Sequence, residues 1–181
     1  MNDRPATVPA RPIVLVGLMG AGKSSIGRRL AARLNMPFVD ADDEIEKAAN
    51  LSISEIFERH GEAAFRDGER RVIARLLGGP LGVLATGGGA FMDPQTRALI
   101  RERGLSIWLK AEIETLLKRV ARRSHRPLLK QGDPRAVLEK LMVERYPVYA
   151  EADLAIETGD GPHDLVVDQI LAILREKALA T

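Results

Sequence analysis

One segment near the N-terminus has the residue types and spacing that bind the phosphates of a nucleotide. The segment GLMGAGKS, residues 17–24, matches the pattern G-x-x-x-x-G-K-[ST]. Its glycines let backbone N–H groups turn inward around the phosphates, while Lys23 can reach the β- and γ-phosphates and Ser24 can present a hydroxyl to Mg²⁺. We therefore predict a nucleoside triphosphate site. A glycine-rich turn that binds no nucleotide is the alternative, which the register of Lys23 and Ser24 disfavours.

The phosphate loop does not by itself identify the group that receives the phosphate. A regulatory GTPase uses the same loop, but it usually also carries an N-K-x-D guanine signature and a D-x-x-G loop. Neither pattern occurs in this chain. The sequence therefore favours a kinase that acts on a small molecule.

Three aspartates stand together in FVDADDEIE, residues 38–46, where a buried strand is expected to lead into a helix. Ligands of open parallel sheets gather beyond the carboxyl ends of the strands, so Asp40 and Asp42 should face the γ-phosphate. The strand in GVLATGGG ends without an acid, which leaves Asp40 as the partner of Ser24 at Mg²⁺. Asp42 can then accept a hydrogen bond from an acceptor hydroxyl and orient it for attack. Asp43 is interpreted as a helix N-cap.

Other polar residues suit an anionic acceptor. Arg66 and Arg145 each carry a planar fork that binds a carboxylate through two parallel hydrogen bonds, although either one alone would also fit a surface ion pair. Glu69 lies three residues after Arg66 on the same helix face, where it can hold that guanidinium or touch the acceptor. The glycine run 87–89 removes side chains where a strand ends, which lets a ligand approach the backbone closely or simply forms a tight turn.

The elements that must position these groups alternate along the chain. Apolar runs typical of strands occur at 13–16, 82–86, 105–109 and 153–157, with a weaker one in PFVD. Amphipathic patterns typical of helices occur at 24–34, 62–77, 94–103, 112–122 and 163–178. This alternation predicts an α/β fold in which helices cover both faces of a parallel sheet.

Boundary residues support the predicted helices. Ser52 and Glu55 form a capping-box pattern. Asp93 and Asp133 each precede a proline, which is typical of an N-cap followed by the first helical residue. Gly104 suits a helix end.

The composition limits the class of protein. The chain has 181 residues, is 45% hydrophobic and 29% charged, and carries a net charge of +2, which fits one globular domain (12–178) behind a flexible tail (1–11). It has no cysteine, and its three histidines are too dispersed for a zinc site. No segment has the length of a membrane span or the pattern of a signal peptide. We expect a soluble cytoplasmic protein that binds neither membranes nor nucleic acid.

Taken together, the motifs resemble those of the shikimate kinases. The resemblance runs from about residue 13 to residue 174 and rests on GLMGAGKSS, DADDEIE, EAAFRDGE, TGGGA, RSHRPLL and ERYPVY, in that order. It implies the P-loop fold of the nucleoside-monophosphate kinases, with three α/β/α layers and five parallel strands in the order 2-3-1-4-5. It also implies that Mg-ATP phosphorylates the 3-hydroxyl of shikimate, a small cyclic carboxylate, on the route to aromatic amino acids.

The resemblance also implies a role for each site residue. The catalytic residues would be Asp42 as the base, Lys23, and Arg126 in a mobile lid at about 122–134. The residues that bind shikimate, some of them on helices at about 41–70, would be Asp42, Arg66, Glu69, Gly87, Gly88, Gly89 and Arg145. The residues that bind ATP would be Gly20, Ala21, Gly22, Lys23, Ser24, Ser25, Arg119 and Arg126, with Arg119 packed on adenine. The ligands of Mg²⁺ would be Ser24 and, through water, Asp40, and the protein would be a monomer.

Three rival interpretations remain at this point. A gluconate kinase of the same fold would also need a carboxylate clamp and a hydroxyl-orienting aspartate, although the full set of motifs disfavours it. A nucleic-acid-dependent ATPase would use the basic cluster KRVARRSHR, residues 118–126, and would bind in a strongly salt-dependent way. Near-neutral net charge and the lack of neighbouring aromatic residues weaken that interpretation. An inert nucleotide-binding module would not need every polar group of the predicted site.

Overall fold

The strands form one parallel sheet whose spatial order differs from their order in the sequence. The computed structural model of the protein describes residues 9–122 and 132–179. The sheet has five strands in the order β2-β3-β1-β4-β5, and every pair is parallel. The strands are β1 Ile13–Val16, β2 Phe38–Asp40, β3 Val83–Ala85, β4 Leu105–Ala111 and β5 Leu154–Thr158. The predicted strand order and parallel pairing are confirmed.

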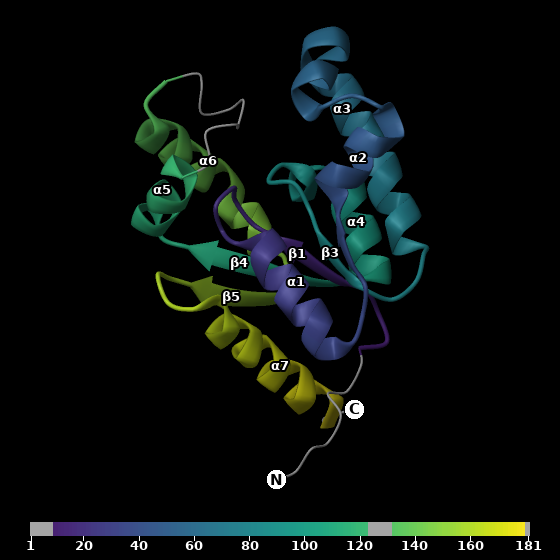
Figure 1. Ribbon diagram of the computed structural model, residues 1–181, viewed down its shortest axis with the longest axis vertical. Helices are drawn as coiled ribbons and strands as arrows, with labels where there is room; N and C mark the ends of the chain where they lie inside the picture. Colours follow the sequence, from purple (N-terminus) through teal and green to yellow (C-terminus); the bar gives the residue numbers. More distant parts are fainter. Residues whose placement is uncertain (1–8, 123–131, 180–181) are drawn as a thin grey trace.

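Helices cover both faces of this sheet (Figure 1). Helix α1 (Lys23–Leu34) packs beside α7 (His163–Leu179) over one face. Right-handed crossovers that run in opposite directions across a sheet lie on opposite faces. Because α1 leads from β1 to β2 and α4 (Pro94–Arg103) leads the other way, from β3 to β4, α4 covers the second face. The three predicted layers are confirmed.

Four more elements complete the chain around the carboxyl ends of the strands. They are α2 Ala41–Ala49, α3 Ile53–Leu77, α5 Ile113–Ala121 and α6 Pro134–Tyr149. A short 3₁₀ turn, η1 Ala90–Met92, follows the glycine run 87–89. Helix α2 begins directly where β2 ends, so it carries its first side chains to the edge of the sheet where ligands of this architecture gather.

Two hydrophobic clusters hold these elements. The central strand β1 reads IVLV and is completely buried, as expected for a parallel strand with helices on both sides. A separate cluster of Ile45, Ile56, Phe65 and Val72 joins α2 to α3. The pair α2–α3 therefore has a small cluster of its own, while Ala41 of α2 and Ile73 and Leu77 of α3 also belong to the main core around the sheet.

The predicted helix boundaries hold at most positions. Ser52 and Glu55 make both hydrogen bonds of the capping box at the start of α3. Asp93 and Asp133 are the N-caps of α4 and α6, each followed by proline, and Gly104 is the C-cap of α4. The pattern at 62–77 covers only the second part of α3, because this helix begins at Ile53 and continues across a kink at Gly61.

The prediction that Asp43 caps α2 is wrong. The N-cap is Asp40, whose Oδ1 atom accepts the backbone N–H of Asp42 at 2.9 Å. Asp40 still has extended backbone angles, φ −99° and ψ 121°, since it is also the last residue of β2. The helix follows this strand without a linker, so the residue at the junction becomes the cap and Asp43 lies in the first turn.

Some predictions fall on parts of the chain that the structure does not describe. Residues 1–8 of the predicted tail and 123–131 of the predicted lid lie outside the described residues. Within residues 9–122 and 132–179, no helix combines the length and the apolar character needed to cross a membrane.

Candidate functional site

Glycines give the phosphate loop backbone conformations that other residues rarely adopt. Gly17, Gly20 and Gly22 have φ angles of 148°, 83° and 95°, a region in which L side chains are strained. Lys23 begins α1, and its Nζ atom donates to the carbonyl oxygens of Gly17 at 2.7 Å and Leu18 at 2.9 Å. The loop thus combines an ammonium group with a helix N-terminus, an arrangement that attracts anions.

Ser24, Asp40 and Asp42 form a chain of hydrogen bonds beside this loop. Ser24 Oγ donates to Asp40 Oδ2 at 2.7 Å, and Asp40 Oδ1 accepts the backbone N–H of Asp42. A hydroxyl and a carboxylate are suitable ligands for Mg²⁺. No group of three or more acidic or histidine side chains able to hold a metal occurs in the described residues. Ser24 and Asp40 are therefore the residues here that could hold a Mg²⁺ ion, which would supply positive charge beside bound phosphates.

A cleft with a volume of 820 Å³ opens above the phosphate loop. Its walls include the loop, Asp40, Asp42 and the first two residues of the glycine run, together with Arg119 and His163. The cleft therefore extends from the predicted acceptor aspartate to the predicted nucleotide arginine. Arg66, Glu69 and Arg145 do not line it.

Each glycine of the run 87–89 lies against a different charged side chain of the predicted acceptor site. A Cβ atom at the first glycine would lie 2.8 Å from Asp42 Oδ1, at the second 3.0 Å from Arg145 Nη1, and at the third 2.6 Å from Arg66 Nη1. Consecutive Cα atoms are about 3.8 Å apart, so one carboxylate and two guanidinium groups gather along a very short stretch of backbone. They come from α2, α6 and α3 respectively.

Glu69 holds one of these guanidinium groups. Arg66 Nη1 donates to Glu69 Oε1 at 2.9 Å, while Glu62 lies farther away at 3.7 Å. Glu69 is buried, and this burial raises the pKa of its carboxyl group against the opposing effect of Arg66. Its other oxygen, Oε2, has no hydrogen-bond partner within the described part of the chain. Glu69 therefore orients Arg66 and keeps one oxygen able to accept a ligand's hydroxyl.

Arg145 and Tyr149 form the other side of the acceptor region. The Arg145 side chain is buried, yet its Nη1 atom has no hydrogen-bond partner among residues 9–122 and 132–179. Burying a charged group with an unused donor is costly, so this donor is suited to bind an anionic ligand. The Tyr149 hydroxyl donates to the carbonyl oxygen of Gly88. Burial raises the pKa of Tyr149 to about 12, so this hydroxyl remains a donor and fixes the Gly88 peptide beside Arg145.

Arg119 joins three elements at the opposite end of the cleft. Its Nη1 atom donates to the carbonyl oxygens of Gly20 and Ala21 at 3.1 Å each, and its Nη2 atom donates to that of Gly159 at 2.5 Å. Burial lowers the pKa of Arg119. The guanidinium thus connects α5 with the phosphate loop and with the segment after β5. Arg126, predicted to act from the lid, lies outside the described residues.

His163 and Tyr149 are among the residues at the site that were not predicted from the sequence. His163 lines the cleft, with Nδ1 2.8 Å from the hydroxyl oxygen of Ser25, and Tyr149 holds the glycine run. Signals for both exist. His163 follows the fifth strand at the edge where ligands of parallel sheets bind, and Tyr149 stands four residues after Arg145 and so shares its helix face.

Comparison with known proteins identifies the family. The family model described as shikimate kinase matches residues 19–175. The chain belongs to the shikimate kinase family. Among curated shikimate kinases, that of Caulobacter vibrioides is 59% identical over 176 residues, covering 97% of this chain and 88% of the relative. That of Rhodopseudomonas palustris is 57% identical over 171 residues, covering 94% of this chain and 84% of the relative.

Solved structures of shikimate kinases also share this fold. A shikimate kinase from Acinetobacter baumannii, solved in complex with shikimate, superimposes with a TM-score of 0.91 at 38% identity, covering 95% of this chain and 97% of that one. A gluconokinase from Sinorhizobium meliloti has a TM-score of 0.65 at 19% identity, covering 94% of each chain. At that identity the gluconokinase shows a common fold and nothing about the acceptor.

Proposed function

We propose that the protein transfers the γ-phosphoryl group of ATP to the 3-hydroxyl group of shikimate. The observation that carries this proposal is the meeting of Asp42, Arg66 and Arg145 at the glycine run 87–89, beside the phosphate loop. Shikimate joins one carboxylate to three ring hydroxyls, so it needs a cationic clamp and a hydrogen-bond acceptor a short distance apart. Membership of the shikimate kinase family and the shikimate complex of a 38% identical relative support the same acceptor.

The acceptor end supplies binding and orientation. Arg66 and Arg145 would bind the carboxylate through paired, charge-assisted hydrogen bonds, and Glu69 would hold Arg66 in place. Asp42 would accept a hydrogen bond from the 3-hydroxyl and aim its oxygen at the γ-phosphorus. As the new P–O bond forms, the bond from that phosphorus to the bridging oxygen of ADP breaks, and the hydroxyl proton passes to Asp42.

The nucleotide end neutralises charge. The ammonium of Lys23, which lies on the carbonyl oxygens of the loop, would move to the β- and γ-phosphates. Ser24, and Asp40 through water, would hold Mg²⁺, which counters charge on the phosphates when bound. Gly20, Ala21, Gly22 and Ser25 would bind phosphates, Arg119 would pack on adenine, and Arg126 would close over the site.

The test measures ADP release from Mg-ATP with shikimate, with gluconate and with no acceptor. We expect turnover only with shikimate, and phosphorus NMR of the product should show a phosphate ester at the 3-position. Equal stimulation by gluconate would show that the site does not distinguish the two acids, and it would contradict shikimate as the specific acceptor. Release independent of any acceptor would refute the transfer reaction. Analytical ultracentrifugation of the same preparation tests the expected monomer.

A further inference from the structure

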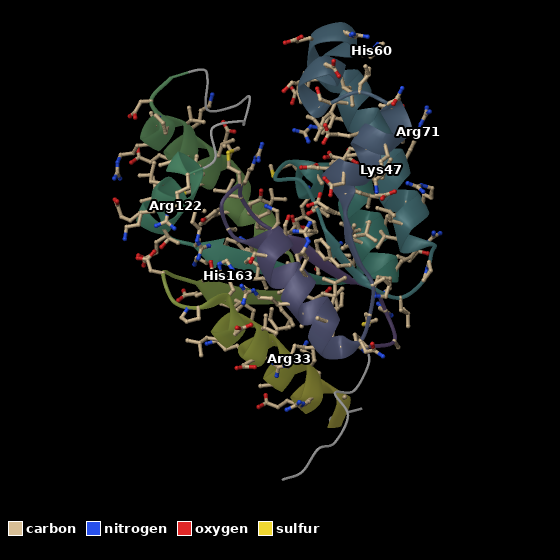
Figure 2. The ribbon with its side chains drawn as sticks, in the orientation of Figure 1. Arg33, Lys47, His60, Arg71, Arg122 and His163 are labelled. Carbon is tan, nitrogen blue, oxygen red and sulfur yellow. The ribbon has the colours of Figure 1, made fainter. Side chains whose placement is uncertain are left out.

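His163 connects the last helix to the phosphate loop. It is the first residue of α7, and its Nδ1 atom lies 2.8 Å from Ser25 Oγ in α1. Its Nε2 atom would lie 3.5 Å from a Cβ atom placed at Gly22, so the ring stands over the loop. Figure 2 shows His163 near the start of α7, on the side where α1 lies. The ring thus borders the cleft and contacts the hydroxyl of Ser25, the residue after Ser24.

Buried residues of α7, among them Val167 and Ile170, pack in the main core, and two exposed ion pairs also join α1 to α7 behind this contact. Arg29 Nη1 lies 3.1 Å from Asp164 Oδ2, and Arg33 Nη1 lies 3.0 Å from Asp168 Oδ1. Both pairs join the same two helices, one turn apart. His163 is therefore presented to the loop by a packed helix, which suits a residue that sets the orientation of another group.

Burial and nearby positive charges favour the neutral form of the His163 imidazole. Burial lowers its pKa, and the positive charges of Arg119 on α5 and Arg29 on α1 lower it further, whereas Asp164 opposes them. Asp160, in the segment before α7, faces Arg119 and is paired with Lys118. A neutral imidazole carries a single N–H, so its contact with Ser25 has two possible directions.

The direction of this hydrogen bond decides what the Ser25 hydroxyl can bind. If Nδ1 carries the proton, it donates to Ser25 Oγ, and the hydroxyl proton of Ser25 is left to point into the cleft. If Nε2 carries the proton, Ser25 donates to Nδ1, and its oxygen turns lone pairs toward the cleft. Phosphate oxygens only accept hydrogen bonds, so a bound nucleotide favours the first arrangement.

We propose that His163 is a positioning residue for the nucleotide, which holds Ser25 Oγ through Nδ1–H so that the Ser25 hydroxyl donates to a phosphate oxygen. This inference rests on the nucleotide half of the proposed function and not on the identity of the acceptor. It gives the adjacent serines complementary roles. Ser24 donates its proton to Asp40 and so offers lone pairs to a cation, whereas Ser25 receives a proton from His163 and so offers its own proton to an anion.

The test is calorimetric binding of ADP in the absence of any acceptor. We expect His163→Ala to weaken ADP binding about 3- to 10-fold, the effect of one lost hydrogen bond. His163→Asn should bind ADP nearly as well as the native chain, because its amide can donate from the position of Nδ1. His163→Gln, which places its amide near Nε2 instead, should resemble His163→Ala. In turnover assays the loss should appear in the KM for ATP and leave kcat almost unchanged.

Two further measurements separate positioning from a general structural effect. Ser25→Ala should weaken ADP binding to a similar extent, and adding His163→Ala to it should cause no further loss. Nitrogen NMR of the ADP complex should show the His163 proton on Nδ1. The matched control is His60→Ala, because His60 is exposed on α3 and far from His163 in Figure 2. Thermal unfolding of each variant confirms that it is folded.

Each outcome has a definite consequence. Native ADP affinity in His163→Ala, an additive loss in the double variant, or an Nε2–H tautomer in the complex would overturn the inference. So would His163→Asn being as weak as His163→Ala while folded. If shikimate fails to stimulate turnover but ADP binding follows the expected pattern, the proposed acceptor is wrong and the role of His163 stands.

Discussion

Substituting Gly89 with alanine tests whether the glycine run leaves room for Arg66. A Cβ atom there would lie 2.6 Å from Nη1 and 2.7 Å from Cζ of Arg66, well inside the roughly 3.5 Å of a normal contact, so the guanidinium must shift by about 1 Å. The backbone of Gly89, with φ −93°, accommodates alanine. Because the guanidinium ends a flexible side chain, we expect a small change in folding stability.

The same shift should have a large effect on acceptor binding. It breaks the 2.9 Å pair between Arg66 and Glu69 and misaligns the proposed carboxylate clamp. A charge-assisted hydrogen bond contributes about 1.5 to 3 kcal/mol, so the KM for shikimate should rise about 10- to 150-fold. The KM for ATP should stay near its native value, because the proposed nucleotide contacts lie at the phosphate loop.

The assay is ADP release over a range of shikimate concentrations at saturating Mg-ATP, then over a range of ATP. Gly68→Ala is the matched control. Gly68 lies on the same helix as Arg66, and a Cβ atom there would meet nothing within 4 Å. In an Arg66→Ala background, Gly89→Ala should add little. A native KM for shikimate, or equal rises for both substrates, would refute the reasoning.

Two more variants probe turnover and folding. Asp42→Asn keeps the shape of the side chain, so we expect kcat to fall about 10²- to 10⁴-fold in the ADP-release assay; a loss below tenfold would remove Asp42 as the base. Asp93→Asn keeps the N-cap of α4 but loses the ion pair with Arg70, which lowers the pKa of Asp93 to about 2. The folded state lowers this pKa from 3.8. The carboxylate therefore stabilises the fold at pH values above 3.8, and this stabilisation is lost as the pH falls toward 2. Urea unfolding at pH 7 should show a loss of about 1 kcal/mol, discounted for partial exposure, and equal stability of the two proteins would contradict the prediction.

Local sequence patterns were sufficient for most of the strands and helices, whereas the strand order came from the resemblance to a family. The apolar runs at β1 and β4 have one physical cause, burial on both faces of a parallel sheet. This burial requires several consecutive apolar residues, so it can be recognised within a short segment. The caps at Ser52 and Asp93 are equally local, since each bonds a backbone N–H three residues later. The choice between Asp40 and Asp43 as a cap was not local in this sense, because it depends on where β2 stops.

The convergence of the acceptor residues lay beyond such patterns. Arg66 and Arg145 are on different helices, and only the packing of α3 and α6 around the glycine run brings them to neighbouring positions. Their residue types suggested a carboxylate clamp, and the resemblance to a family supplied the pairing. For His163, neither the residue type nor the family resemblance indicated a role. One histidine at a helix start has no spacing pattern, so its contact with Ser25 became visible only when α7 packed against α1.

The two ends of the site are built in different ways, and this difference bears on specificity. The phosphate loop consists of a few consecutive residues between β1 and α1, and the positive φ angles of its glycines set its shape. The proposed acceptor end would depend instead on side chains from α2, α3 and α6 that meet at the glycine run. A gluconokinase can therefore share the sheet and helices at a TM-score of 0.65 without sharing an acceptor. If the proposed acceptor site is right, a change of acceptor in this chain would require new side chains around the glycine run, whereas the nucleotide end could remain as it is.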